Sequence, residues 1–422
     1  MKTILYSLFI TLIITSMQIN SQAQTNDTAV MGASYANDIF YSLKNGTVKS
    51  EPRNNWDLGF YTNRWSAGII INDGLGVKLY TYPKSDISGW NSIDTSGISQ
   101  WVNTYNSDTV WEDGAFNRHA LGHPDYGWGV YNMVSHDVVG DSLYILQLST
   151  GGLKKVWIER KNSVLNTYYF KYADIDGQNE VIEVLDVTPF ESKLFVYYSI
   201  ANQAVIDREP AKADWDLLFS KYAGTTFDSE GNPAPYIVTG VISNITDTIS
   251  ANHQVSPDFE DWTAAAPFNG DKATIGHSWK TFNMGTYTYD IEDSLVYFVR
   301  NESGDIYKFV LDYFSGSSTG KFGFVKKQVG FTSINETNNK MALTITPNPA
   351  SSYTTVQCID ATANAGMVKI YDQSGRMVVN YNVHISNGQF RLDVSSLQSG
   401  LYILELNQAG KAARQKLMVQ QF

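Results

Sequence analysis

WDLGF at residues 56–60 recurs as WDLLF at residues 215–219, and this repeat divides most of the chain into two similar halves. Further matches occur in the same order: GIIIN (68–72) with GVISN (240–244), WGVYNM (128–133) with WKTFNM (279–284), and DSL (141–143) with DSL (293–295). Collinear matches of this kind are typical of an internal duplication. We predict two homologous β-rich units, at residues 27–205 and 206–330.

The composition favours strands. The chain has 422 residues, of which 43% are hydrophobic, 17% charged and 13% aromatic. Aromatic and β-branched residues suit a half-buried pleated surface, so we expect an all-β fold. The formal net charge of −11 argues against nucleic-acid binding, which depends on Lys and Arg neutralising phosphates.

The first residues have the pattern of a secretory signal peptide. A single Lys2 precedes an apolar run from Ile4 to Met17, and small residues occur after it at Ser21 and Ala23. We predict cleavage after Ala23, so that residues 1–23 are removed. The run is too short and too polar for a membrane helix, and no later stretch is long enough to span a membrane.

The chain changes character near its end. A polar, turn-rich linker is predicted at residues 331–340, and residues 341–422 read as short alternating strands of a small β-sandwich. The motifs PNP (347–349), IYDQSGRMV (370–378) and LQSGLY (397–402) resemble the type A sorting domain of the Bacteroidetes type IX secretion system. The resemblance implies recognition by that secretion machinery, passage through the periplasm, and release or anchoring at the outer cell surface.

The second unit resembles the HmuY-like haem-binding proteins. The resemblance rests on WDLLFSKY (215–222), WKTFNMG (279–285) and the aromatic stretch at 287–313. It implies a β fold that holds one haem or a similar porphyrin between two axial His or Met side chains.

His253 and Met284 are the cofactor-binding residues that this resemblance implies. Met284 comes directly after W-x-x-F-N, and His253 lies about thirty residues upstream, where the family has its other ligand. Met133 is the counterpart in the first unit, which lacks an upstream His or Met at that distance. Two simpler interpretations stay open, a core methionine and a solvated histidine.

No catalytic or metal-binding residue is predicted. G-x-S-x-G at residues 316–320 precedes an alternating strand where a nucleophile elbow requires a helix, so a hairpin loop is expected. His119, His123 and His136 have no recognised metal spacing. Cys358, alone in an apolar-alternating segment, is expected in a core. The sequence therefore predicts a haem-binding surface protein, or alternatively a non-catalytic adhesion or glycan-binding protein.

Overall fold

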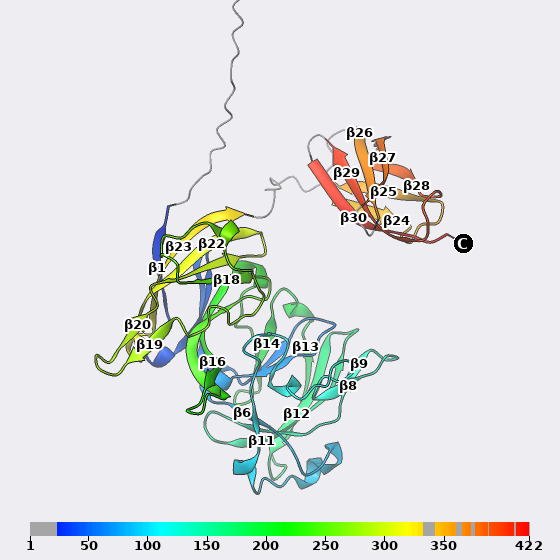
Figure 1. The fold of residues 1–422 in the computed structure, drawn as a ribbon. Coiled ribbons are helices and arrows are strands. Elements are labelled where there is room, and N and C mark those ends of the chain that lie inside the picture. Colours follow the sequence, from blue (N-terminus) through cyan, green and yellow to red (C-terminus); the bar gives the residue numbers. More distant parts are fainter. Residues whose placement is uncertain are drawn as a thin grey trace, which may run out of the picture. The chain divides into compact units, whose positions relative to one another are not determined.

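The computed structural model describes residues 23–331, 342–359, 365–372, 376–386, 388–408 and 411–421. The chain divides into two compact units, residues 1–332 and 333–422 (Figure 1). We call the first unit the cargo and the second the sorting unit. Residues 1–22 of the predicted signal peptide, and the predicted linker after Phe331, lie outside the described residues.

Both units consist of antiparallel strands, and the all-β prediction is confirmed. The cargo strands are β1 (Thr25–Val30), β2 (Asn37–Ser42), β3 (Gly46–Pro52), β4 (Leu58–Tyr61), β5 (Ile69–Ile71), β6 (Lys78–Thr81), β7 (Asn103–Thr104), β8 (Gly129–Tyr131), β9 (Asp137–Gly140), β10 (Tyr144–Gln147), β11 (Leu153–Asn162), β12 (Thr167–Asp174), β13 (Val181–Asp186), β14 (Phe195–Ser199), β15 (Ala204–Ile206), β16 (Leu217–Phe227), β17 (Pro233–Ser243), β18 (Thr248–His253), β19 (Lys280–Asn283), β20 (Thr288–Ile291), β21 (Leu295–Arg300), β22 (Asp305–Phe314) and β23 (Lys321–Phe331).

The helical segments in the described cargo are short 3₁₀ turns between strands. They are η1 (Ala33–Tyr35), η2 (Arg53–Asn55), η3 (Asp73–Leu75), η4 (Ile87–Ser92), η5 (Ile98–Gln100), η6 (Ala115–Asn117), η7 (Thr188–Phe190), η8 (Lys212–Asp214), η9 (Trp262–Ala264) and η10 (Gly316–Ser318). Of these, η10 lies in the connection between β22 and β23, where the G-x-S-x-G motif predicts a hairpin loop.

The cargo contains two β-sandwiches. The first packs the sheet β15-β14-β4-β5 on the sheet β13-β12-β11-β10-β6-β7, with β8 and β9 attached beside β11. The second packs β17-β16-β2-β3 on β1-β23-β22-β21-β18. Each sandwich has its own core, which contains Phe60 and Phe170 in the first and Phe219 and Phe324 in the second.

The two four-stranded sheets also pack on each other. Phe40, Tyr197 and Leu218 alternate with residues of the sandwich cores along β2, β14 and β16, and they share a third apolar cluster with Trp56 and Trp215. These inner sheets are therefore buried on both faces. This explains why their strands read as nearly continuous apolar runs in place of a strict alternation of apolar and polar residues.

The two sandwiches exchange strands. The strands before the first WD motif belong to the second sandwich, and the strands just before the second WD motif belong to the first sandwich. β2 pairs with β16, with Tyr41 opposite Leu217, while β14 pairs with β4, with Tyr198 opposite Leu58. β1 pairs with β23 along its whole length, and in Figure 1 it lies beside the last strands of the cargo. The first 30 or so residues of the described cargo therefore belong to the second sandwich.

This pairing places β1–β3 in the second sandwich, whereas the predicted units assign residues 27–205 to the first. The first sandwich runs from η2 to β15, whereas the second combines β1–β3 with β16–β23. The predicted unit at 27–205 thus includes three strands that pack elsewhere. The physical reason is that a strand's pattern shows which face it buries, but not which copy of a duplicated sheet supplies its neighbour.

The matched residues of the two copies make the same hydrogen bonds. The Asp57 carboxylate accepts from the backbone N–H of Ile200 at 2.8 Å, and the Asp216 carboxylate accepts from that of Leu43 at 2.5 Å. The side-chain amide of Asn72 donates to the carbonyl of Trp56 at 3.0 Å, as that of Asn244 does to the carbonyl of Trp215 at 2.7 Å. The WD motif therefore fixes the start of each inner strand.

The sorting unit is a small sandwich, as predicted. Its strands are β24 (Ala342–Thr346), β25 (Tyr353–Ile359), β26 (Ala365–Tyr371), β27 (Met377–His384), β28 (Gln389–Asp393), β29 (Gly400–Gln408) and β30 (Lys411–Val419). They form the sheets β24-β25-β28 and β27-β26-β29-β30. Cys358 is buried in the core between them, as expected.

Asp38 on β2 is the polar centre of the cargo. Its carboxylate accepts from Arg208 Nη2 at 2.7 Å and from Ser220 Oγ at 2.6 Å, and lies 3.3 Å from Arg53 Nε. All four side chains are buried. Because they come from β2, η2, β16 and the segment after β15, one carboxylate connects both sandwiches.

We expect Asp38→Ala to lower the free energy of unfolding of the cargo by about 3–5 kcal/mol, because it leaves the Arg208 charge buried without its partner. Chemical denaturation of the mature protein measures the change. Asp214→Ala, at an exposed position of η8, is the matched control and should change stability by less than about 0.5 kcal/mol. Equal effects of the two variants would contradict the central role of Asp38.

Candidate binding site

The two copies differ in the segment after their first inner strand. In the second copy β16 continues to Phe227 and turns into the long strand β17. In the first copy β4 ends at Tyr61, and residues 62–68 form a loop before β5. This loop presents Trp65, whose side chain is 63% exposed.

Buried side chains hold the loop from beneath. Lys161 on β11 donates from Nζ to the carbonyl of Asn63 at 2.6 Å and also to that of Ser66. Trp128 Nε1 donates to the carbonyl of Ala67 at 2.9 Å. These bonds pair backbone carbonyls that face the interior, so the position of Trp65 is set by the core.

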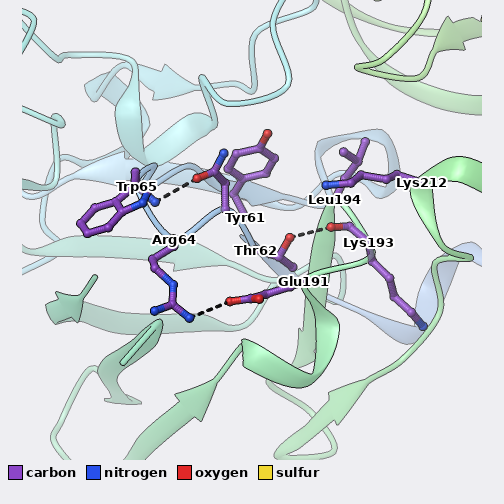
Figure 2. Close-up of a pocket in the computed structure, with 9 residues that line it drawn as sticks. Tyr61, Thr62, Arg64, Trp65, Glu191, Lys193, Leu194 and Lys212 are labelled. Carbon is purple, nitrogen blue, oxygen red and sulfur yellow. Dashed lines mark hydrogen bonds and ion pairs between the residues drawn. The ribbon is translucent and has the colours of Figure 1, made fainter. Parts of the chain in front are cut away.

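A pocket with a volume of about 270 Å³ opens beside this loop. Tyr61, Thr62, Asn63, Arg64 and Trp65 line one side, and Glu191, Lys193, Leu194 and Lys212 line the other. In Figure 2 Arg64 extends toward Glu191, to which its guanidinium is ion-paired at 3.2 Å, and Thr62 donates to the backbone of Lys193.

The polar groups of the pocket are held in place. Glu191 also accepts from the amide of Asn166 at 3.0 Å, and this bond, with Arg64, lowers the pKa of its carboxyl, so the carboxylate is ionised at neutral pH. The Asn63 side-chain oxygen accepts from the backbone N–H of Trp65 at 2.9 Å. The pocket therefore has a guanidinium and a carboxylate in its lining, with Trp65 at its edge.

Exposed apolar side chains lie on two segments that the Trp65 loop contacts. The Trp65 ring lies 6.5 Å from the ring of His136, which ends the β8–β9 turn that carries exposed Met133 and Val134. Arg64 donates to the carbonyl of Val164, which is exposed together with Leu165. We call Trp65, Met133, Val134, Val164 and Leu165 the Trp65 surface. Exposed apolar residues that gather on neighbouring segments are typical of interaction sites.

The predicted haem ligands lie on two separate elements. His253 is exposed at the end of the edge strand β18. Met284 comes after β19, at the turn of the β19–β20 hairpin, and is 73% exposed. Neither residue lines any of four well-formed pockets in the described part of the chain. The interpretation of Met284 as a core methionine is wrong.

Met133 occupies the equivalent place in the first copy and is 76% exposed. In both hairpins the preceding asparagine accepts two backbone N–H groups of the turn: Asn132 from Val134 and Ser135, and Asn283 from Gly285 and Thr286. The W-x-x-[FY]-N-M motif therefore encodes a hairpin with an exposed methionine after its asparagine.

The sequence did not single out Trp65. A tryptophan close to a buried strand is most simply interpreted as core, and the chain has ten of them. The available signal was the difference between the two copies, since TNRWSA at residues 62–67 has no counterpart after WDLLF.

Two further findings concern the described part of the chain alone. It has no group of three or more His, Cys, Asp or Glu side chains placed to hold a metal ion. It also has no helix that is long and apolar enough to cross a membrane.

Residues 344–420 match the family model of the secretion system C-terminal sorting domain. The match confirms the predicted sorting domain, and it indicates export by type IX secretion to the cell surface or the medium. No curated protein matches this chain. The comparisons do not support the resemblance to the HmuY-like family.

Two solved structures are distantly similar. Dimeric latent PorU from Porphyromonas gingivalis has 12% identity over 82% of this chain and 34% of that chain, with a TM-score of 0.18. The match therefore spans about a third of the length of PorU. A biofilm associated protein, BSP domain, has 10% identity over 96% of this chain and 68% of that chain, with a TM-score of 0.16. At these scores neither carries an argument about fold or function.

Lys161→Met should loosen the Trp65 loop, because two inward-facing carbonyls lose their donor at a cost of about 1–3 kcal/mol each. Burial lowers the pKa of Lys161 to about 7, whereas an unfolded lysine titrates near about 10.4. Between pH 7 and pH 10 this lysine is protonated in the unfolded chain but largely neutral in the folded protein. The free energy of unfolding of the wild type therefore rises with pH relative to that of the variant.

Amide hydrogen exchange of residues 62–68 and denaturation at pH 7 and pH 10 measure both effects. Exchange should be faster in Lys161→Met, and the stability difference from wild type should be larger at pH 10. Unchanged exchange in the loop would show that Lys161 does not hold it.

Proposed function

We propose that the secreted cargo is a non-catalytic surface-binding protein that recognises a glycan at the Trp65 pocket. The observation that supports this most directly is the exposed indole of Trp65 on a loop that buried Lys161 holds in place. A large apolar ring kept in solvent by buried hydrogen bonds is difficult to explain by stability alone, since exposure of the ring contributes nothing to the core.

The groups around the indole suit a sugar ring. A sugar has an apolar C–H face, which packs on an aromatic ring, and a rim of hydroxyls that both donate and accept hydrogen bonds. Glu191 accepts, while Arg64 and Lys212 donate. The volume of about 270 Å³ is at the lower end for ligand pockets and is suited to a single ring, with the rest of a chain lying on the Trp65 surface.

Trp65→Ala should reduce glycan binding by roughly tenfold or more, the loss expected for about 1.4 kcal/mol or more of stacking. The measurement is retention of the mature protein on an array of bacterial and host glycans, followed by titration of the best ligand. Ile182→Ala is the matched control, because Ile182 is an exposed apolar residue of the same sandwich on β13. Equal loss in both variants, or retention of no glycan, would contradict the proposal.

Haem binding through His253 and Met284 stays a prediction of the sequence resemblance. The observation in its favour is that both side chains are exposed, so the imidazole and the thioether are accessible to a porphyrin iron. To bind one haem in this way, the His253 imidazole and the Met284 thioether would both have to coordinate the same iron.

Titration with haemin tests this second candidate. If the pair binds haem, a saturable Soret shift with low-spin ferric spectra should appear, and His253→Ala or Met284→Ala should each give a weaker, high-spin complex. Met133→Ala, in the equivalent hairpin, is the control and should change little. Absence of a saturable Soret shift in the wild type would exclude haem at these residues.

A further inference from the structure

The Trp65 pocket is richer in positive charge than the chain as a whole. The chain has a formal net charge of −11, yet three of the four charged side chains that line the pocket are cations: Arg64, Lys193 and Lys212. Arg64 is ion-paired with Glu191, and Lys193 with Asp207. Lys212 is thus the cation of the lining that has no carboxylate partner in the described part of the chain.

The duplication supplies a residue with which Lys212 can be compared. Lys212 begins η8 just before the second WD motif, and Arg53 begins η2 just before the first. The side-chain amide of Asn72 donates to the backbone carbonyl of Arg53, and that of Asn244 donates to the backbone carbonyl of Lys212, each at 2.7 Å. The two basic residues therefore occupy equivalent places in the two copies.

The carboxylate that pairs with Arg53 has no equivalent in the other copy. Arg53 is ion-paired with Asp38 on β2, at 3.3 Å. Leu43 and Ile200 are equivalent, because each donates its backbone N–H to the carboxylate of a WD motif. The residue five positions before Leu43 is Asp38, whereas the residue five positions before Ile200 is Phe195, which is buried in an apolar cluster. The basic residue is therefore kept beside the pocket, while its carboxylate partner is lost.

We propose that the glycan bound at the Trp65 pocket contains a uronic acid, whose carboxylate pairs with the Lys212 ammonium as Asp38 pairs with Arg53. This inference rests on the proposed glycan binding and names the class of sugar. Lys212 is half-buried, so its charge is screened less than that of an exposed lysine. Glu191 is neutralised by Arg64 and accepts from sugar hydroxyls, so it does not oppose a ligand carboxylate as a free charge would.

A glycan array that presents uronate-containing oligosaccharides beside their carboxyl-reduced forms tests the proposal on the mature protein. Reduction converts each carboxylate into a neutral hydroxymethyl group and keeps the sugar ring. We expect the uronate forms to be retained and the reduced forms to bind at least about tenfold more weakly. Added salt should weaken the uronate complexes and reduce this difference.

Three variants assign the effect to Lys212. Lys212→Gln removes the charge, so it should weaken the uronate forms by about tenfold, leave the reduced forms unchanged and keep the melting temperature. Lys212→Arg keeps the charge and should bind the uronate forms within about threefold of wild type. Lys78→Gln, at an exposed position on β6 of the same sandwich, is the matched control for net charge and should bind as wild type.

The outcomes separate failure of this inference from failure of glycan binding itself. If glycans bind and Trp65→Ala weakens them, but the uronate and reduced forms bind equally, the pocket takes a neutral sugar and the inference is overturned. Unchanged affinity of Lys212→Gln for the uronate forms would also overturn it, as would equal losses in Lys212→Gln and Lys78→Gln. Retention of no glycan by the wild type would overturn the proposed function together with this inference.

Discussion

The cargo depends on the pairing of Asp38 with Arg208. A carboxylate and a guanidinium this deeply buried are tolerated only when each has several partners, and here they are supplied by Arg53, Ser220 and the carbonyl of Pro52. Those partners come from segments that lie far apart in the sequence. The pair can form only when β2 and the segment after β15 reach the inner sheets together, so it selects the exchanged arrangement of strands over two independent sandwiches.

The inner sheets leave few places where a ligand can bind, because both of their faces are covered. Function is therefore expected at the strand ends, and the two copies differ there. After the WD motif the first copy has the short Trp65 loop, while the second has the long β16–β17 hairpin. The same topological position therefore carries a short loop with an exposed indole in one copy and a long hairpin in the other.

The sequence predicted the strand content, the sorting domain and the equivalence of the WD motifs, because each depends on local patterns of apolar, turn and motif residues. It did not predict the exchange of β1–β3, for which the available signal was the short match of Tyr41-Ser42-Leu43 with Tyr198-Ser199-Ile200. Nor did it locate the site. In the sequence Trp65 looks like an ordinary core aromatic residue, and only the packing shows that its ring is exposed. The motif around Met284 is visible as a repeat, but its turn geometry is not apparent from spacing.

The pairing of β1 with β23 has a consequence for the order of events during synthesis. A chain emerges with its N-terminus first, so Thr25–Val30 are made long before Lys321–Phe331, their partner, exists. The first sandwich, by contrast, is contiguous from η2 to β15 and can close as soon as it is complete. During that interval the earliest strands are unpaired edges, which are prone to bind other chains. A holding factor that covers them until the last cargo strand arrives would raise the yield of folded protein.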